Sequence, residues 1–331
     1  MIEKNHPPIK YGKTGVLIIN LGTPDSTGWF DIRKYLREFL SDRRVIEVNP
    51  IIWQIILNLF ILNFRPSKTA KAYKEIWMND KNMSPLLYYT QKQAEKISSS
   101  FSKENIVIDF AMRYGNPSIN SKIHKLHKMG CENLVILPLY PQYAAATTAT
   151  VCDEVYRTLM KMRWQPSLKI IPHYESDPLY IDALVNSINK KINEISWKPD
   201  LIIASYHGIP KKYFDKGDPY HCYCHKTTRL ISEKFNSIKI KTTFQSRFGP
   251  QEWLQPYTDK TLENLPKEGV KNVLTICPGF ASDCVETLEE IQIQAKESFL
   301  NSGGENFDMV PCLNDNSDHI ILLKSLIERN I

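Results

Sequence analysis

The 331-residue sequence lacks any apolar run that approaches the roughly 20 residues needed to cross a membrane. Its first residues, 1–13, are polar and do not contain the apolar core of a secretory signal peptide. Its cysteines, seven in all, are an odd number that indicates reduced thiols and no disulfide framework. These absences predict a cytoplasmic protein that does not span a membrane.

The sequence also lacks a strong excess of one charge and a glycine-rich phosphate loop. Its 42 basic and 36 acidic residues give a net charge of +6, without the long basic stripe typical of nucleic-acid-binding proteins. The segment Asn20-Leu-Gly-Thr-Pro contains one glycine, where a dinucleotide-binding fingerprint has several. We therefore expect neither a nucleic-acid partner nor a nicotinamide cofactor.

Short apolar runs rich in β-branched residues recur along the chain, each followed by a helical pattern. The runs are apolar on both faces, which is typical of parallel strands covered by helices on each side. The expected strands form two groups, 15–21, 106–112, 133–139 and 168–172, then 201–206, 241–245, 272–277 and 307–311. The expected fold class is α/β, with two similar Rossmann-like domains that each contain a mainly four-stranded parallel sheet flanked by helices.

An internal similarity supports this division. Residues 133–140 (NLVILPLY) resemble residues 272–280 (NVLTICPGF), each a strand followed by a proline and an aromatic residue. We place the N-terminal domain at 1–165 and the C-terminal domain at 166–315, with a C-terminal helix at 316–331 that packs back on the first domain. Because ligands of open α/β sheets bind beyond the carboxyl ends of the strands, the residues after each strand are candidates for function.

The segment 51–62 (IIWQIILNLFIL) is apolar at ten of twelve positions. The polar exceptions, Gln54 and Asn58, are four residues apart and would share one narrow face of a helix. Basic residues flank the segment: Arg43, Arg44, Arg65, Lys68, Lys71 and Lys74. The pattern suits a core helix. It equally suits a lip that dips into one membrane leaflet while its basic flanks meet anionic headgroups, or that covers a flat apolar ligand.

His207, in the segment Ser205-Tyr-His-Gly-Ile-Pro210, follows a predicted buried strand and would project from the carboxyl edge of the sheet. A neutral imidazole at this place can accept a proton or bind a metal. A single histidine after a strand is more often a structural residue, so its position alone leaves both roles open.

The segment Ser282-Asp-Cys-Val-Glu-Thr-Leu-Glu-Glu290 also follows a predicted strand, and it opens a helix. Asp283, Glu286 and Glu290 are spaced by three and four residues, which places them on one face of that helix. The row is either a solvated acidic face at a helix N-terminus or a series of carboxylates along which a divalent cation binds. One histidine beside such a series shifts the preference toward iron or another transition metal.

Two further groups contain residues with binding chemistry. The segment His221-Cys-Tyr-Cys-His225 has metal-ligand side chains but lacks a second pair at zinc-like spacing, so structural or transient thiol roles rank ahead of a bound metal. Aromatic, amide and guanidinium groups follow three strands, in the segments 113–117, 140–143 and 245–254. Arginines there suit ligand carboxylates, and aromatic faces suit a planar ligand.

Together these motifs resemble the ferrochelatase family over about residues 14–315. The resemblance rests on LIINLGTPDS (17–26), SPLLYYT (84–90), MRYGNP (112–117), LPLYPQYAAATT (137–148), SYHGIP (205–210), GDPY (217–220), FQSRFGPQEWLQPYTD (244–259) and SDCVETLEE (282–290). It implies two Rossmann-like halves with a porphyrin site between them. It also implies that the protein inserts ferrous iron into protoporphyrin IX with release of two protons, the terminal step of haem b synthesis.

The resemblance also implies roles for single residues. His207 matches the histidine that binds metal and removes pyrrole protons, and Glu286 matches its carboxylate partner. Glu290 and, less closely, Asp283 match an acidic row that conducts metal ions or protons. Residues 45–64 match the lip region of the family. Positions near the macrocycle or its carboxylates are matched by Arg65, Ser84, Arg113, Tyr114 and Trp253.

Cysteine placement departs from parts of the family. Some members have a histidine at the position of Cys284, and animal-type members bind a two-iron cluster through cysteines in the YPQY stretch and a C-terminal extension. Here three alanines (144–146) follow the YPQY stretch, and no cysteine follows Cys312. We therefore expect ferrous iron as substrate, no permanently bound cofactor and no iron–sulfur cluster.

The resemblance and the lip together predict a cytoplasmic monomer or homodimer with peripheral contact at the inner membrane surface. Two alternatives remain open: a chelatase for coproporphyrin or another tetrapyrrole, and a haem or porphyrin carrier without catalytic activity. The pairing of His207 with Glu286 argues against the carrier, which has no use for a base opposite a metal-binding carboxylate. The apolar lip favours the more apolar protoporphyrin.

Overall fold

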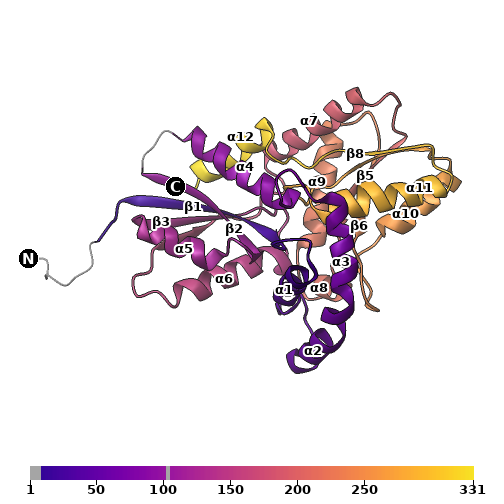
Figure 1. Cartoon of the computed structure of the whole chain (residues 1–331). Coiled ribbons are helices and arrows are strands. Elements are labelled where there is room, and N and C mark those ends of the chain that lie inside the picture. Colours follow the sequence, from indigo (N-terminus) through magenta and orange to yellow (C-terminus); the bar gives the residue numbers. More distant parts are fainter. Residues whose placement is uncertain (1–8, 102–104) are drawn as a thin grey trace, which may run out of the picture.

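The computed structural model describes residues 9–101 and 105–331. Two parallel four-stranded sheets form its centre, in the orders β2-β1-β3-β4 and β6-β5-β7-β8 (Figure 1). The strands are β1 (Lys13–Thr23), β2 (Ile106–Gly115), β3 (Cys131–Pro138), β4 (Ser167–Ile170), β5 (Leu201–His207), β6 (Ile240–Gln245), β7 (Asn272–Ile276) and β8 (Asn306–Met309). The expected α/β class with two similar four-stranded sheets is confirmed, and the two similar sequence segments occupy equivalent places as β3 and β7.

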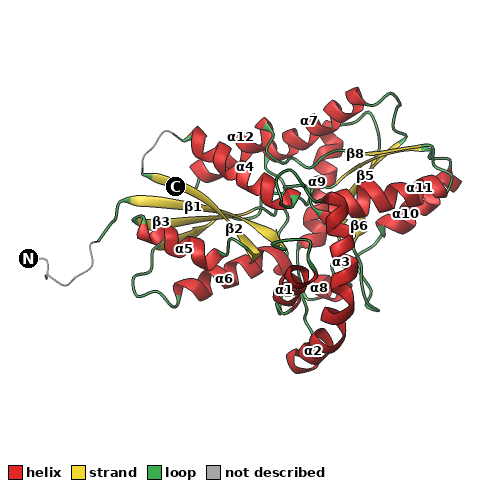
Figure 2. Cartoon of the chain, viewed as in Figure 1, coloured by secondary structure: helices red, strands yellow, loops and turns green. Residues whose placement is uncertain are grey.

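Helices cover the faces of both sheets (Figure 2). The α-helices are α1 (Trp29–Leu40), α2 (Pro50–Ile56), α3 (Leu62–Ile76), α4 (Pro85–Ser100), α5 (Ile119–Lys128), α6 (Thr150–Leu159), α7 (Pro178–Glu194), α8 (Lys211–Asp215), α9 (Tyr220–Lys234), α10 (Thr258–Asn264), α11 (Lys296–Asn301) and α12 (Ser317–Glu328). One 3₁₀ turn, η3 (Leu265–Glu268), follows α10. The π-helical segments are η1 (Leu57–Ile61), η2 (Ala145–Ala149) and η4 (Val285–Ala295). Because π-helical turns are rare and concentrate at functional sites, η4 is of particular interest.

Buried residues alternate between the two faces of the central strands, which explains why these strands are apolar throughout. Val16 and Ile18 of β1 belong to one core cluster, and Leu17 and Ile19 belong to another that includes residues of α5 and α6. Strand β5 divides its side chains in the same way, between the first cluster and a third that includes residues of α10 and α11. Both faces of each sheet are therefore buried from solvent.

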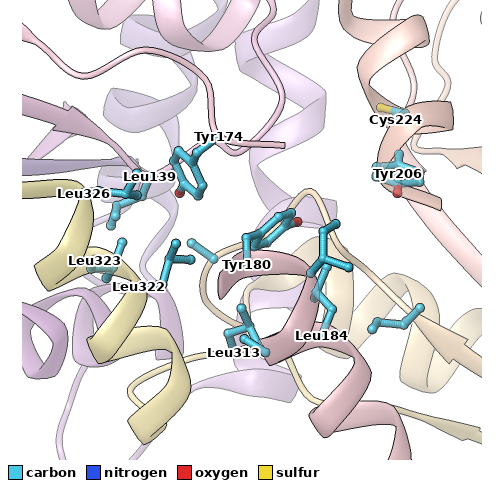
Figure 3. Packing of buried hydrophobic residues seen from close by; sticks show 14 of the residues in the cluster. Leu139, Tyr174, Tyr180, Leu184, Tyr206, Cys224, Leu313, Leu322, Leu323 and Leu326 are labelled. Atoms are coloured by element: carbon cyan, nitrogen blue, oxygen red, sulfur yellow. The ribbon is translucent and has the colours of Figure 1, made fainter. Parts of the chain in front are cut away.

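One hydrophobic core joins the two halves of the molecule. Its buried residues come from β1 and α4 of the first half, from β5 and α9 of the second, and from α7 and α12. Figure 3 shows Tyr180 of α7 between Leu322 of α12 and Tyr206 of β5. Helix α12 contacts both α4 and α7. Because these side chains are buried by one another, the two sheets share a core rather than forming separate globules.

The first sheet continues beyond residue 165. Strand β4 pairs with β3 from Ser167 opposite Asn133 to Ile170 opposite Ile136. A boundary between residues 165 and 166 would divide this sheet, so the N-terminal half extends at least to the end of β4.

The lip, residues 45–64, extends from the first half as α2, η1 and the start of α3 (Figure 1). Asn49 begins α2, since its side chain accepts hydrogen bonds from the amides of the next turn. Leu57 and Leu62 are fully buried against α1, so part of the apolar run belongs to the core. The rest forms the exposed lip face, which consists of Ile51, Ile52, Ile55, Leu59, Phe60 and Phe64.

A membrane-crossing helix was not expected. Within residues 9–101 and 105–331, no helix is both long enough and apolar enough to span a bilayer.

Candidate functional site

His207 is the last residue of β5 and lies at the carboxyl edge of the second sheet, as expected. Its Nδ1 lies 2.7 Å from the carbonyl oxygen of Gly208. Because a carbonyl oxygen only accepts hydrogen bonds, Nδ1 carries a proton and the lone pair of the neutral ring lies on Nε2. The geometry therefore presents Nε2 as the atom that accepts a proton or binds a metal.

Gln245, at the end of the neighbouring strand β6, links the His207 strand to η4. Its backbone carbonyl accepts a hydrogen bond from the amide of Gly208 at 2.8 Å. Its side-chain oxygen accepts from the Ser205 hydroxyl at 2.7 Å, and its Nε2 donates to the backbone carbonyl of Glu286 at 2.6 Å. The residue is buried, which shields these bonds from water. One side chain thus sets the position of His207 relative to Glu286.

Glu290 lies further along η4 and is held by Ser246, which follows β6. The Ser246 amide donates to Glu290 Oε1 at 2.7 Å, and the Ser246 hydroxyl donates to the other carboxylate oxygen. Burial raises the pKa of Glu290 above its ordinary value. The Glu286 carboxylate adds to this rise, while the Ser246 hydrogen bonds and His207 oppose it. Glu290 therefore lies within electrostatic range of both His207 and Glu286.

Asp283 does not join this row. The π-helix η4 begins only after it, so Asp283 precedes the helix. Its buried carboxylate accepts hydrogen bonds from the Thr287 hydroxyl at 3.0 Å, the side-chain amide of Asn314 at 2.7 Å and the backbone amide of Cys312 at 3.2 Å. The expected single acidic face is wrong for this residue, because three donors outside the row hold its oxygens.

Helix α3 contacts η4 and supplies the opposite side of the site. Arg65 keeps an exposed surface, but the protein atoms packed around it lower its pKa, an effect that the Glu286 carboxylate opposes. The Arg65 guanidinium also lies 5.0 Å from the ring centre of Phe248. Burial raises the pKa of Tyr35 and of Tyr73, and Glu286 raises both further. A guanidinium and two neutral phenols therefore lie near Glu286.

Trp253 lies beside Gly208, the residue that follows His207. A Cβ atom added to Gly208 would lie 3.2 Å from the Trp253 ring and 2.9 Å from the backbone carbonyl of Gln245, so a side chain at this position would force the Gln245 backbone to shift. The Trp253 indole donates a hydrogen bond to the Phe248 carbonyl at 3.0 Å, and the two rings lie 5.6 Å apart. A series of contacts therefore leads from Arg65 through Phe248 and Trp253 to Gly208, next to the histidine.

Ser84, Arg113 and Tyr114 lie in the interior. The Ser84 hydroxyl caps α4 by accepting a hydrogen bond from the Leu87 amide at 3.2 Å. Arg113 forms a buried ion pair with Asp42, which also accepts a hydrogen bond from the Tyr114 hydroxyl at 3.0 Å. In this structure the three residues anchor α4 and the base of the lip. Their expected contacts with a ligand stay predictions.

The candidate ligands do not form a complete metal-binding shell. Nowhere in the described part of the chain are three histidine, cysteine, aspartate or glutamate side chains placed to hold one metal ion. The roles of His207, Glu286 and Glu290 as metal ligands stay predictions. The Cys222–Cys224 pair is also no chelate, since Cys224 is fully buried and Cys222 is exposed.

Some residues of the site had not been singled out from the sequence. Gln245 and Ser246 lay inside a recognised motif, and their position directly after a strand was the available signal. Tyr35 and Tyr73 had no such signal. They approach Glu286 only because α1 and α3 pack against η4 in a common cluster.

The raised pKa of Glu290 predicts that replacing Glu290 with glutamine stabilises the protein near neutral pH. The ionised carboxylate is less favourable in the folded than in the unfolded chain, so its ionisation opposes folding as pH rises. We expect the melting temperature of E290Q to exceed that of the wild type at about pH 8, and the difference to shrink as the pH falls through the raised pKa of Glu290 and the carboxylate takes up a proton. Scanning calorimetry measures both values.

Glu289→Gln is the matched control for this effect, since it removes a charge from the same helix outside the Ser246 contacts. Two results would show that burial of the Glu290 charge does not cause the stabilisation. One is a difference in melting temperature between wild type and E290Q that does not change with pH. The other is an equal rise in melting temperature for E289Q and E290Q.

The fold and the site together define a chelatase-like α/β protein with paired parallel sheets. SirB from Bacillus subtilis with Fe3+ has a similar structure, with a TM-score of 0.58 and 11% identity over 96% of this chain and 95% of that chain. CbiX, the terminal enzyme for siroheme biosynthesis in denitrifying bacteria, gives a TM-score of 0.52 and 11% identity over 95% and 98% of the two chains. At such low identity these similarities show the fold alone.

Sequence comparison identifies the family. The family model for ferrochelatase matches residues 13–331. The ferrochelatase of Allorhizobium ampelinum is 55% identical over 333 aligned residues, covering 100% of this chain and 97% of that protein. That of Rhizobium meliloti is 55% identical over 98% of this chain and 97% of its own, and that of Brucella ovis 50% identical over 98% and 94%. The chain belongs to the ferrochelatase family, which confirms the resemblance seen in its motifs.

Proposed function

We propose that the protein inserts ferrous iron into protoporphyrin IX and thereby forms haem b, with release of two protons. The observation that carries the proposal is a histidine with its lone pair on Nε2, placed within electrostatic range of Glu290, which itself lies within range of Glu286 on the same π-helix. Curated ferrochelatases at 50–55% identity support the same reaction. Iron is the substrate, and this chemistry requires no resident cofactor.

The proposed reaction exchanges two pyrrole protons for one ferrous ion. Contacts with the rest of the macrocycle supply the energy that bends the ring and exposes its nitrogen lone pairs and N–H groups. His207 Nε2 accepts a pyrrole proton, while the hydrogen bond from Nδ1 to Gly208 keeps the ring oriented. The carboxylates of Glu286 and Glu290 stabilise the incoming cation and the charge that moves as the protons leave. Asp283 is left out of this role because it precedes η4, the helix on which Glu286 and Glu290 lie.

Arg65 and the aromatic pair Phe248 and Trp253 are the proposed contacts to the macrocycle. The Arg65 guanidinium, which keeps an exposed surface, pairs with a porphyrin carboxylate. The exposed ring of Phe248 offers an aromatic face for stacking, and the buried Trp253 ring packs behind it and supports a ligand bound there. Protoporphyrin is the preferred substrate because the exposed lip face is apolar. Coproporphyrin carries more carboxylates and would favour a more polar entrance to the site.

Anaerobic incubation with ferrous iron and either porphyrin tests the function. We expect protoporphyrin fluorescence to disappear as haem absorption appears, with a kcat/KM at least about tenfold above that for coproporphyrin. Porphyrin binding without metal insertion would leave the carrier as the better explanation. A higher kcat/KM for coproporphyrin would reverse the substrate assignment.

The exposed lip face is also proposed as a peripheral contact with the membrane surface. It combines apolar side chains on α2, η1 and α3 with the exposed basic residues Arg43, Lys68 and Lys71 at its flanks. Each apolar side chain transferred from water contributes about 1.5–3 kcal/mol, and each basic residue near an anionic surface about 1 kcal/mol.

Replacing Ile55, Leu59 and Phe60 together by serine is expected to weaken binding to vesicles of phosphatidylglycerol and phosphatidylcholine by at least about tenfold. Vesicle co-sedimentation measures the change. Met160→Ser, which removes an exposed apolar side chain directly after α6 and outside the lip, should bind as the wild type does. Equal binding by all three proteins, or none by the wild type, would exclude the lip as the membrane contact.

A further inference from the structure

Two histidines of α9, His221 and His225, lie together outside the proposed reaction site. They are four residues apart, and their ring centres are separated by 4.4 Å. No hydrogen bond within residues 9–101 and 105–331 involves either imidazole ring. Two adjacent imidazoles without protein partners have ring nitrogens available for a ligand.

Aromatic neighbours fix the position of this pair. The His221 ring stacks on Phe244 of β6, with ring centres 5.8 Å apart, and it meets the edge of Phe214 at 5.1 Å. His225 is exposed on the outer side. Burial lowers the pKa of His221 and of His225, and the proximity of His221 lowers the second further. The lowered pKa values favour the neutral imidazole, which is the form that binds metals.

The chemistry of the pair selects one class of ligand. Imidazole nitrogens suit borderline divalent ions, with affinity rising toward Ni2+ and Cu2+, and they do not suit Mg2+ or Ca2+. Metal–nitrogen bonds of about 2.0–2.1 Å place two ligand nitrogens roughly 3–3.4 Å apart. Rings whose centres are 4.4 Å apart reach this separation by rotating about the bond to the ring.

We propose that His221 and His225 chelate one divalent transition-metal ion at the surface of the protein. No third histidine, cysteine or carboxylate of the described residues completes the set, so water supplies the other ligands and the ion exchanges readily. The site is separate from Glu286 and Glu290. Helix α9 packs against the core shared by the two halves, whereas η4 packs on the other face of the second sheet.

Calorimetric titration with Ni2+ of the full chain tests the site. We expect His225→Ala to weaken binding at this site by about tenfold or more, since a single imidazole loses the advantage of chelation. His124→Ala, which removes an exposed histidine of α5, should leave the titration unchanged. Glu286→Gln should also retain this binding step, because the proposed ion does not touch η4.

Electron paramagnetic resonance of the Cu2+ complex gives a second readout that does not depend on any activity. The wild type is expected to show hyperfine coupling to two nitrogens, and His225→Ala to one. Unchanged Ni2+ affinity in His225→Ala would overturn the proposal, as would a single coupled nitrogen in the wild type. Loss of the binding step in Glu286→Gln would also overturn it and place the ion at η4.

Discussion

Replacing His207 by alanine is expected to lower the rate of iron insertion by about 10²–10⁴-fold, the usual contribution of a positioned proton acceptor. The ring is oriented by its bond to Gly208 at the end of β5, so its loss removes the positioned Nε2 atom. Porphyrin binding should persist, because Arg65 and Trp253 are untouched. Stopped-flow fluorescence with ferrous iron under anaerobic conditions measures both steps.

Added imidazole sharpens this test. Free imidazole entering the space left by the side chain should restore part of the H207A activity, with a pH dependence that follows the added base. H124A, which removes an exposed histidine far along the chain, should turn over normally. Wild-type rates in H207A would remove the histidine from the reaction, and a loss of porphyrin binding equal to the loss of rate would make it a binding residue.

Replacing Gly22 by alanine is expected to destabilise the protein by at least about 4 kcal/mol, through steric overlap in the core. Gly22 pairs with Tyr114 across β1 and β2, and its φ of +115° is a conformation that residues with a side chain rarely adopt. An added Cβ would lie 1.8 Å from the Tyr114 carbonyl oxygen, so the backbone of one strand must move. The movement would also disturb the Tyr114–Asp42 contact at the base of the lip.

Chemical denaturation measures the free energy of unfolding of G22A and of G269A. The comparison distinguishes steric overlap of the added Cβ from the strain of a positive φ. Gly269 also has a positive φ, +87°, but an added Cβ there meets no atom within 4 Å. G269A should therefore lose only about 1 kcal/mol. An equal decrease in the free energy of unfolding for the two variants would show that the backbone near Tyr114 moves to accommodate the added Cβ without loss of stability.

The contrast between these glycines shows what a motif can and cannot reveal. The sequence around Gly22 excluded a phosphate-binding loop, but it did not show why a glycine stands there. That reason is the carbonyl of Tyr114, more than 90 residues away in the chain, at a distance that depends on strand pairing. A local sequence does not contain this information.

The fold itself was largely predictable, for a simple physical reason. Strands buried on both faces are apolar throughout, and the helices between them show a helical repeat of apolar residues. Each strand or helix can therefore be recognised from its own stretch of sequence. All eight expected strands and their division into two groups are present. The division into domains was less accurate, because the core that joins α4, α7, α9 and α12 depends on contacts between distant segments.

The same distinction holds at the site. The sequence by itself determined that His207, Glu286 and Glu290 follow strands of one sheet, because the carboxyl ends of parallel strands meet at one edge. Only the tertiary structure decided that Gln245 joins the two sides, that Asn314 and Cys312 hold Asp283 outside the acidic row, and that Tyr35 and Tyr73 approach Glu286. Each of these depends on a contact between elements far apart in the chain. The local sequence pattern indicates which residues are buried and whether they form a helix or a strand. The hydrogen-bond partner of a polar side chain is decided only when helices and strands pack against one another.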